Sequence, residues 1–445
     1  MTRGGRMGNH GNGPRRAGAR RSVRRAAALA AVGALVVGAV ACGGDDNGGA
    51  GGKGAAGGPT GAEAERLLGP EHKAAGTPVK IGLVSDGQSQ AFDARTEIYA
   101  ARATADWWNA RRGGIGGHPI DLVTCETAAD PAKGTDCGNR MVEEHVAAVV
   151  IGQSTVPEDI WEPVHQAGIP TMFFQTNGQD ILTDKATSFV LSNPLTTALG
   201  LPISVAEDDH AEKAAFVVVD VPVAISLFES IGPTLVKQAG LGYQLVRVPL
   251  GTADMSAQMR QVATGGAGVV QVVGNDAFCI AAFQGLRDAG YDGKVTAVSQ
   301  CVTDATRDAL PGDQLKGMYV TSGVALGAKD DPTYRLYQAV MGAYGRHVDV
   351  DNNVSMVGYS VLAALATSLA GIDGDVTPAS VTRTIKGMPE RPLPGGGGVK
   401  FRCGGTAMSL APAVCSNQWL RAALDGHGEP AHYQAVDSTG ILEGL

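Results

Sequence analysis

The sequence predicts an α/β protein of two doubly wound lobes, each with a parallel sheet. Three observations carry this prediction. Between residues 79 and 300, apolar runs of strand length alternate with amphipathic stretches of helix length, the pattern of βαβ units. Several of these runs, such as 147–151, are apolar without alternation, as expected for strands buried on both faces. The series occurs twice, so we expect two lobes.

The first series covers residues 79–192. Its first helix places Ile98, Ala101, Ala105 and Trp108 on one face at helical spacing. The glycine-rich segment 113–117 ends this helix, and it is not a dinucleotide fingerprint, because it follows a helix and precedes a strand. In chain order we expect strand 79–86, helix 93–111, strand 118–126, helix 131–145, strand 147–152, helix 157–167, strand 170–175 and strand 188–192.

The second series covers residues 213–300, and a mixed segment follows it. The Pro- and Gly-rich loop 391–398 in that segment lacks the Gly-Lys-Ser/Thr ending of a nucleotide-binding P-loop. In chain order we expect strand 213–220, helix 224–239, strand 243–248, helix 256–263, strand 268–274, helix 276–289, strand 294–300, helix 303–310, strand 318–321, helices 332–344, 355–370 and 380–386, and strands 399–403 and 419–424.

The charge of the chain is unevenly distributed. The whole chain has 36 basic and 44 acidic side chains, but residues 1–41 hold eight arginines and no acid. The remainder therefore has 36 − 8 = 28 basic against 44 acidic side chains, a formal charge of −16. Because neutralising phosphates requires a basic face, an acidic body argues against nucleic acid as a partner.

The N-terminus has the features of an export signal. Arginine-rich residues 1–25 precede a short apolar run that ends in small residues at Ala41, so we expect residues 1–41 to be a signal peptide. The small residues before Cys42 resemble a lipobox, and residues 42–77 would then supply the lipidated cysteine and a Gly-rich tether. Ordinary secretory cleavage near Ala41 is the alternative, and the choice between the Sec and twin-arginine routes stays open.

Six cysteines remain after Cys42, an even number in an exported chain. Proximity favours the pairs Cys125–Cys137, Cys279–Cys301 and Cys403–Cys415, although six cysteines allow fifteen pairings. Closing loops of this length is worth roughly 3 kcal/mol each. A metal site is the rival interpretation, but the sequence has no CxxC, no HExxH and no close His/Cys cluster. We expect no metal and no cofactor.

The turn after strand 147–152 is the first candidate ligand site. Gly152 ends the strand and is followed by Gln153, Ser154 and Thr155. Ligands of open α/β sheets collect beyond the carboxyl ends of the strands, where three hydrogen-bonding side chains suit a small polar molecule. A plain strand-to-helix turn, in which Ser154 or Thr155 caps the helix, is the alternative.

Three passages resemble type I periplasmic binding proteins of the branched-chain amino acid class, in the correct order. They are Ala105–Val123, Asp130–Thr155 and His165–Thr176. The resemblance covers about residues 79–424 and implies a clamshell of two lobes, joined by three hinge crossings, that delivers its ligand to an ABC importer. With this family as guide we expect lobe 1 to contain residues 78–194 and 298–415, and lobe 2 to contain residues 195–297 and 416–445.

The resemblance also implies where the ligand binds. The positions that it assigns to ligand binding are Asp86, Gln88, Gln153, Ser154, Thr155, Gln175, Thr176, Val223, Asp276 and Phe278. We expect the hydroxyls of Ser154, Thr155 and Thr176 to donate to a carboxylate or an amide. Asp86 and Asp276 would receive a positive group, although Asp276 is equally suited to cap the helix after it. The loop after Asp220 lacks the aromatic residue of amino-acid binders, so the ligand class stays open.

Three function classes come into question for this chain. The first is a solute-binding lipoprotein, a monomer, held by its lipid on the outer face of the cell membrane and docking with ABC permease subunits. The second is an enzyme, which the sequence disfavours because the Gly152–Val156 turn lacks the second glycine of a nucleophile elbow and no histidine has a catalytic spacing. The third is a ligand sensor that presents the same clamshell to a membrane receptor. The sequence does not separate importer from sensor, and we expect no catalytic residue.

Overall fold

The first lobe is built on a parallel five-stranded sheet. The computed structural model describes residues 58–89, 93–193 and 195–438; the predicted signal peptide, Cys42 and the residues up to 57 lie outside them. The strands are β1 (Val79–Ser85), β2 (Ile120–Glu126), β3 (Ala148–Ile151), β4 (Thr171–Phe173) and β5 (Ser188–Val190), in the order β2-β1-β3-β4-β5. Every neighbouring pair is parallel, as the non-alternating apolar runs predict.

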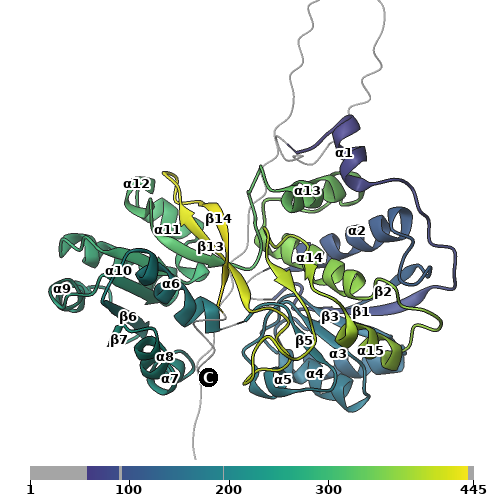
Figure 1. Ribbon diagram of the computed structural model, residues 1–445, viewed down its shortest axis with the longest axis horizontal. Helices are drawn as coiled ribbons and strands as arrows, with labels where there is room; N and C mark the ends of the chain where they lie inside the picture. The colour runs from purple at the N-terminus through teal and green to yellow at the C-terminus, as the bar shows by residue number, and fades with distance from the viewer. Residues whose placement is uncertain (1–57, 90–92, 194, 439–445) are drawn as a thin grey trace, which may run out of the picture. The chain divides into compact units, whose positions relative to one another are not determined.

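Helices cover both faces of this sheet. Ala148 and Val150 of β3 belong to a core with α2 (Arg95–Arg111) and α14 (Asn353–Ser368), which pack side by side (Figure 1). Val149 and Ile151, which point the other way, belong to a second core with α3 (Pro131–Glu143) and α4 (Pro157–Gln166). This period of two along a strand buried on both sides is why β3 reads as an unbroken apolar run.

The second lobe has a seven-stranded sheet in the order β14-β13-β10-β9-β8-β6-β7. Its strands are β6 (Lys213–Val219), β7 (Gly242–Val248), β8 (Val269–Val273), β9 (Lys294–Ala297), β10 (Tyr319–Ser322), β13 (Gln418–Leu424) and β14 (Pro430–Asp437). β6 to β10 are parallel, whereas β13 is antiparallel to both β10 and β14. The sequence predicted the parallel part and β13 but missed β14, a mostly exposed edge strand without an apolar run.

Helices also flank the second sheet on both faces. One core contains α9 (Ser256–Thr264) and α10 (Asp276–Asp288), and the other contains α6 (Leu201–Asp208), α7 (Pro222–Ser230) and α8 (Gly232–Gln238). The predicted single helix 224–239 is therefore two helices. The break falls at Gly232-Pro233, where proline has no backbone N–H to continue the helix.

Two predicted boundaries are corrected by the structure. Residues 61–68 of the predicted tether form helix α1 (Gly61–Leu68), which packs on α13 (Pro332–Tyr344) with an ion pair between Glu63 and Arg335. Residues 298–322 were assigned to the first lobe, but β10 pairs with β9 and α11 (Asp304–Ala309) packs on α10. Sheet membership therefore places this stretch with the second sheet, and a first lobe that resumes only after Ser322 is our proposal for the boundary.

The remaining short elements connect these layers. They are α5 (Gln179–Thr183), a π-helical turn (Thr196–Gly200), a 3-10 turn (Ser299–Cys301), α12 (Gly312–Leu315), α15 (Pro378–Gly387), and the two-stranded ribbon of β11 (Arg391–Pro392) and β12 (Lys400–Phe401). The chain crosses between the two sheets after β5, after β10 and before β13. Among the described helices, none combines the length and the apolar character that crossing a membrane requires.

Candidate functional site

Both sheets have a topological switch point. In the first sheet β1 lies between β2 and β3, and in the second sheet β6 lies between β7 and β8. Chain connections leave the central strand in opposite directions at such a point, which opens a crevice beyond the carboxyl ends of the strands. The predicted turns after β1 and β3, and those after β6 and β8, are therefore the turns that border the two switch points.

Asp86 organises the switch point of the first sheet. Its side chain is fully buried directly after β1. Its carboxylate accepts hydrogen bonds from Thr127 Oγ1 at 2.6 Å, Ser154 Oγ at 3.0 Å, Thr155 Oγ1 at 2.9 Å and the Thr155 backbone N–H at 2.8 Å. One acid thus ties the turns after three neighbouring strands together, and these four donors compensate the burial of its charge.

This network corrects the roles predicted for three residues. A hydroxyl carries one hydrogen, and those of Ser154 and Thr155 point to Asp86. The two side chains therefore fix the turn, and their hydroxyls are not donors to a ligand in this arrangement. Asp86 has no exposed surface with which to receive a positive group. The structure brings these three residues together, and their part in binding a ligand stays a prediction.

Glu97 is a second buried acid at this site, and sequence reasoning missed it. It lies in the first turn of α2 with no exposed surface. Its carboxyl group contacts Ser85 Oγ at 2.6 Å and accepts from the Gln153 backbone N–H at 3.1 Å. Burial, reinforced by the nearby charge of Asp86, raises the pKa of Glu97 to about 8 despite these hydrogen bonds. The carboxyl group is thus mostly protonated near neutral pH.

Two glycines make room for Glu97. A Cβ at Gly152 would collide with Glu97 Oε1, and a Cβ at Gly358 of α14 would lie 2.5 Å from the Glu97 backbone oxygen. Gly152 therefore lets the turn after β3 approach the carboxyl group, and Gly358 lets α14 pack closely on α2. The sequence signal for Glu97 was weak, because a single acid at a helix start is usually solvent-exposed and favourable there.

The other predicted residues of the first lobe are more accessible. Gln88 and Gln175 are exposed, and Gln153 is half-buried. The Gln88 backbone N–H donates to the Glu126 carboxylate at 3.3 Å. Thr176 is buried, and its Oγ1 accepts from the Gly178 backbone N–H at 3.1 Å. Among the described residues, no hydrogen-bond partner contacts the side-chain amide of Gln153 or of Gln175. The hydroxyl of Thr176 likewise donates to no described acceptor.

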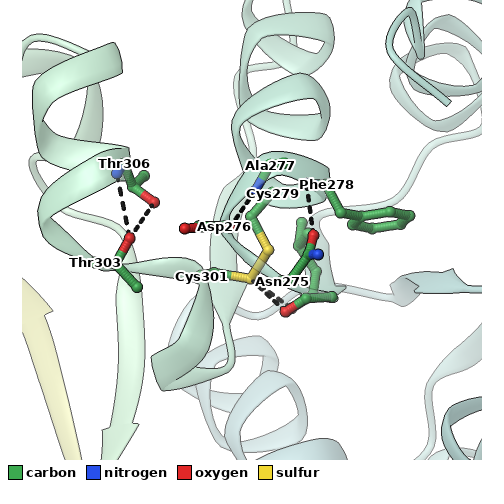
Figure 2. Close-up of a disulfide and its surroundings, with 10 residues drawn as sticks. Asn275, Asp276, Ala277, Phe278, Cys279, Cys301, Thr303 and Thr306 are labelled. Carbon is green, nitrogen blue, oxygen red and sulfur yellow. Dashed lines mark hydrogen bonds between the residues drawn. A yellow bond between two sulfur atoms is a disulfide. The ribbon is translucent and has the colours of Figure 1, made fainter. Parts of the chain in front are cut away.

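The turn after β8 in the second lobe separates two predicted residues. Asn275 is the N-cap of α10, since its Oδ1 accepts from the Phe278 backbone N–H at 3.0 Å. Asp276 is half-buried in the first helical turn, and its Oδ1 accepts from the Ala277 backbone N–H at 2.8 Å. Asp276 and Phe278 point in opposite directions in Figure 2, and Phe278 packs in the core against Gly274. Phe278 is thus a core residue here, and Asp276 does not cap the helix with its side chain.

The turn after β6 carries charge at its start. Asp220 accepts from Arg247 at 2.7 Å, and Arg247 also pairs with Glu229 at 2.6 Å. Val223 lies at the start of α7, but its side chain is outside the described part of the structure.

The three predicted disulfides are present. Cys125–Cys137 joins β2 to α3, and Cys403–Cys415 closes the loop between β12 and β13. Cys279–Cys301 links α10 to the 3-10 turn after β9, beside Asn275 (Figure 2). Cys279–Cys301 therefore restrains α10, the helix that follows the turn after β8. Cys125–Cys137 restrains α3 next to the turn after β2, which contains Thr127.

The chain is similar to known proteins in its sequence pattern and in its fold. The family model described as periplasmic binding protein matches residues 78–414. No curated protein sequence matches the chain. An extracellular ligand-binding receptor from Verminephrobacter eiseniae is 17% identical with a TM-score of 0.62, over 80% of this chain and 100% of that chain.

Two further solved structures contain ligands. The branched-chain amino acid transporter substrate-binding protein LivJ from Streptococcus pneumoniae, in complex with isoleucine, is 14% identical with a TM-score of 0.60, over 81% of this chain and 100% of that chain. A solute-binding protein of an ABC transporter from Rhodopseudomonas palustris, in complex with p-hydroxybenzoic acid, is 18% identical with a TM-score of 0.61, over 81% of this chain and 98% of that chain. At these identities the likeness establishes the fold.

Proposed function

The chain belongs to the periplasmic binding protein family, and from that premise we propose that it captures a small polar molecule between its two lobes, outside the cytoplasm, and delivers it to an ABC importer. The observation that carries the proposal is the pair of switch points, each bordered by turns that the sequence resemblance assigned to ligand binding. In the first lobe these turns are fixed in advance by Asp86 and Glu97, so little ordering is needed when a ligand arrives.

The ligand we propose carries a carboxylate or an amide. The donors left for it in the first lobe are the side-chain amides of Gln153 and Gln175 and the hydroxyl of Thr176, since Ser154 and Thr155 are used by Asp86. Isoleucine and p-hydroxybenzoic acid, the ligands of the two relatives, both contain a carboxylate. In the second lobe, we propose that the half-buried carboxylate of Asp276 accepts from an amino, amide or hydroxyl group of the ligand.

Ligand screening followed by matched substitutions tests this assignment. A thermal-shift screen of amino acids, short amides and aromatic acids should find a hit, because a ligand at about 100 times its Kd stabilises by about 2.7 kcal/mol. Thr176→Val and Gln175→Ala should then each weaken binding about 5- to 150-fold in calorimetry, since each leaves a buried ligand group unpaired at about 1–3 kcal/mol.

Gln179→Ala is the matched control, because Gln179 is an exposed glutamine in α5, four residues beyond Gln175. It should bind the hit as tightly as the wild type. If all three variants bind equally well, the assignment of the ligand to these turns is wrong.

We further propose that the mature protein begins at lipidated Cys42 and stays on the outer face of the cell membrane as a monomer. The small residues before Cys42 and the glycine-rich stretch after it support this proposal. When cells are grown with a fatty-acid probe, the wild-type protein should become labelled and the Cys42→Ala variant should not. Equal labelling of both would contradict lipidation at Cys42.

The neighbouring genes distinguish import from sensing. Permease and ATPase genes beside this one would support import, whereas their absence would favour the alternative, a ligand sensor acting on a membrane receptor.

A further inference from the structure

A cavity lies among the helices of the first lobe, apart from the switch-point turns. Its volume is about 220 Å³, and it is bordered by α2, α13, α14 and the segment 392–394. None of its lining residues belongs to the switch-point turns. At roughly 30 Å³ per water molecule, the volume corresponds to about seven waters, so it suits a ligand far smaller than those of drug-sized pockets.

An exposed cation, Arg112, lies at the edge of the cavity. Arg112 is the residue that follows α2, and it lines the cavity. Its guanidinium carbon lies 5.0 Å from the centre of the Trp107 ring. Within the described part of the chain, Arg112 forms no ion pair, whereas its neighbour Arg111 pairs with Glu65 at 3.0 Å. Stacking on an indole holds a guanidinium in place while leaving its N–H edge free for a carboxylate.

Tyr359 adds a hydroxyl group to the lining of the cavity. Tyr359 of α14 is 1% exposed and lines the cavity beside Trp107. Its hydroxyl forms no hydrogen bond with any described residue and is not one of the fully buried unpaired atoms, so it retains some accessible surface from which to donate. Burial raises the pKa of Tyr359, so the hydroxyl keeps its proton and can donate. An exposed arginine without an ion pair and a hydroxyl donor without a hydrogen bond thus border the same space.

The rest of the lining is largely apolar. Trp108, Leu336 and Leu393 contribute large apolar surfaces, and Ala363 leaves room between them. The Trp108 indole N–H already donates to the Gly114 carbonyl at 3.1 Å, so its ring offers the cavity only apolar surface. A ligand therefore needs a compact apolar body and one anionic end.

We propose that this cavity binds a small apolar monocarboxylate, of the size of benzoate or a short branched-chain acid. The carboxylate pairs with Arg112 and accepts from the Tyr359 hydroxyl, while the apolar body packs on Trp108 and Leu336. The site is separate from the switch-point turns, so it stands or falls independently of the function proposed above.

The indole signals of the protein provide a local readout of this binding. The chain has four tryptophans; Trp107 and Trp108 line the cavity, whereas Trp161 is in α4 and Trp419 is in β13. In heteronuclear NMR of the purified protein, benzoate should shift the indole N–H signals of the first two in a saturable manner and leave the other two in place. Benzyl alcohol, which lacks the charge, should bind at least about ten times more weakly.

Substitutions then test the charge of Arg112 and the hydroxyl of Tyr359 separately, with two control variants. Arg112→Gln should weaken benzoate binding about 10- to 100-fold, and Tyr359→Phe about 5-fold or more without lowering stability, because its hydroxyl has no partner to lose. Arg102→Gln, an exposed arginine on the same helix, and Thr176→Val, in the switch-point turns, should leave these shifts unchanged. Equal affinity of Arg112→Gln and wild type, equal binding of benzyl alcohol, or no shift of the Trp107 and Trp108 signals would each overturn the proposal.

Discussion

The buried carboxyl group of Glu97 makes the stability of the first lobe depend on pH. Its pKa rises from an ordinary 4.5 to about 8 in the folded protein. Folding therefore favours the protonated form, so the contribution to stability is fully present below about pH 4.5 and is lost as the pH rises through about 8. Each unit of difference between the pKa values of the unfolded and the folded protein corresponds to about 1.36 kcal/mol. The free energy of unfolding should therefore fall by about 4 kcal/mol between pH 5 and pH 9.

Glu97→Gln removes this titration while keeping the shape of the protonated acid. The glutamine oxygen can still accept from the Gln153 backbone N–H, and its amide can face Ser85. Unfolding by urea, measured at pH 5 and pH 9, gives the free energy of each protein at each pH. Other titrating groups are shared, so we expect the variant to gain about 4 kcal/mol on the wild type between the two conditions.

Glu143→Gln is the control, because Glu143 is an exposed acid at the end of α3. Its stability relative to the wild type should change by less than about 1 kcal/mol over the same range. The reasoning is refuted if Glu97→Gln behaves like this control, since a carboxyl group that titrates normally at this place would be neither desolvated nor protonated.

Two further predictions concern packing and covalent restraint. Gly358→Ala should lower stability by roughly 1–3 kcal/mol in urea unfolding, because its Cβ would lie 2.5 Å from the backbone of Glu97. Gly342→Ala in α13 is the control: its Cβ would have nothing within 4 Å, so it should raise stability by about 0.5–1 kcal/mol. The same sign for both variants would contradict the close α2–α14 contact. Replacing Cys279 and Cys301 by serine together should cost about 3 kcal/mol, the entropy of a loop of 22 residues, and an unchanged unfolding midpoint would refute a stabilising bridge.

The parallel sheets were the most predictable part of the fold. Strands such as β3 and β6 are buried on both faces, so their sequences are apolar throughout and are bounded by glycine or polar turns. The disulfides followed from proximity alone. Helix α1 and strand β14 were missed because neither has a buried face that leaves a pattern: α1 buries only Leu68, and β14 is mostly exposed.

The faces of α2 were only partly predictable. The pattern placed Ile98, Ala101, Ala105 and Trp108 in the core, but Trp107 is the fully buried tryptophan and Trp108 is half-buried. α2 packs against both the sheet and α14, so it has more than one buried face. Periodicity assumes one buried stripe and one solvated stripe, and it cannot show which helix a later segment of the chain will cover.

The same limit applies to the hydrogen bonds of the candidate site. The ends of buried strands are visible in the sequence, so the turns after β1 and β3 could be predicted to lie at one edge of the sheet, and ligand binding there stays a prediction. Which hydroxyl meets which carboxylate depends on the order of strands in the sheet, and that order places Asp86 directly between Thr127 and Thr155. The acids at the switch point thus hold the turns, and the amides and hydroxyl that they do not use are the donors that we propose for a ligand.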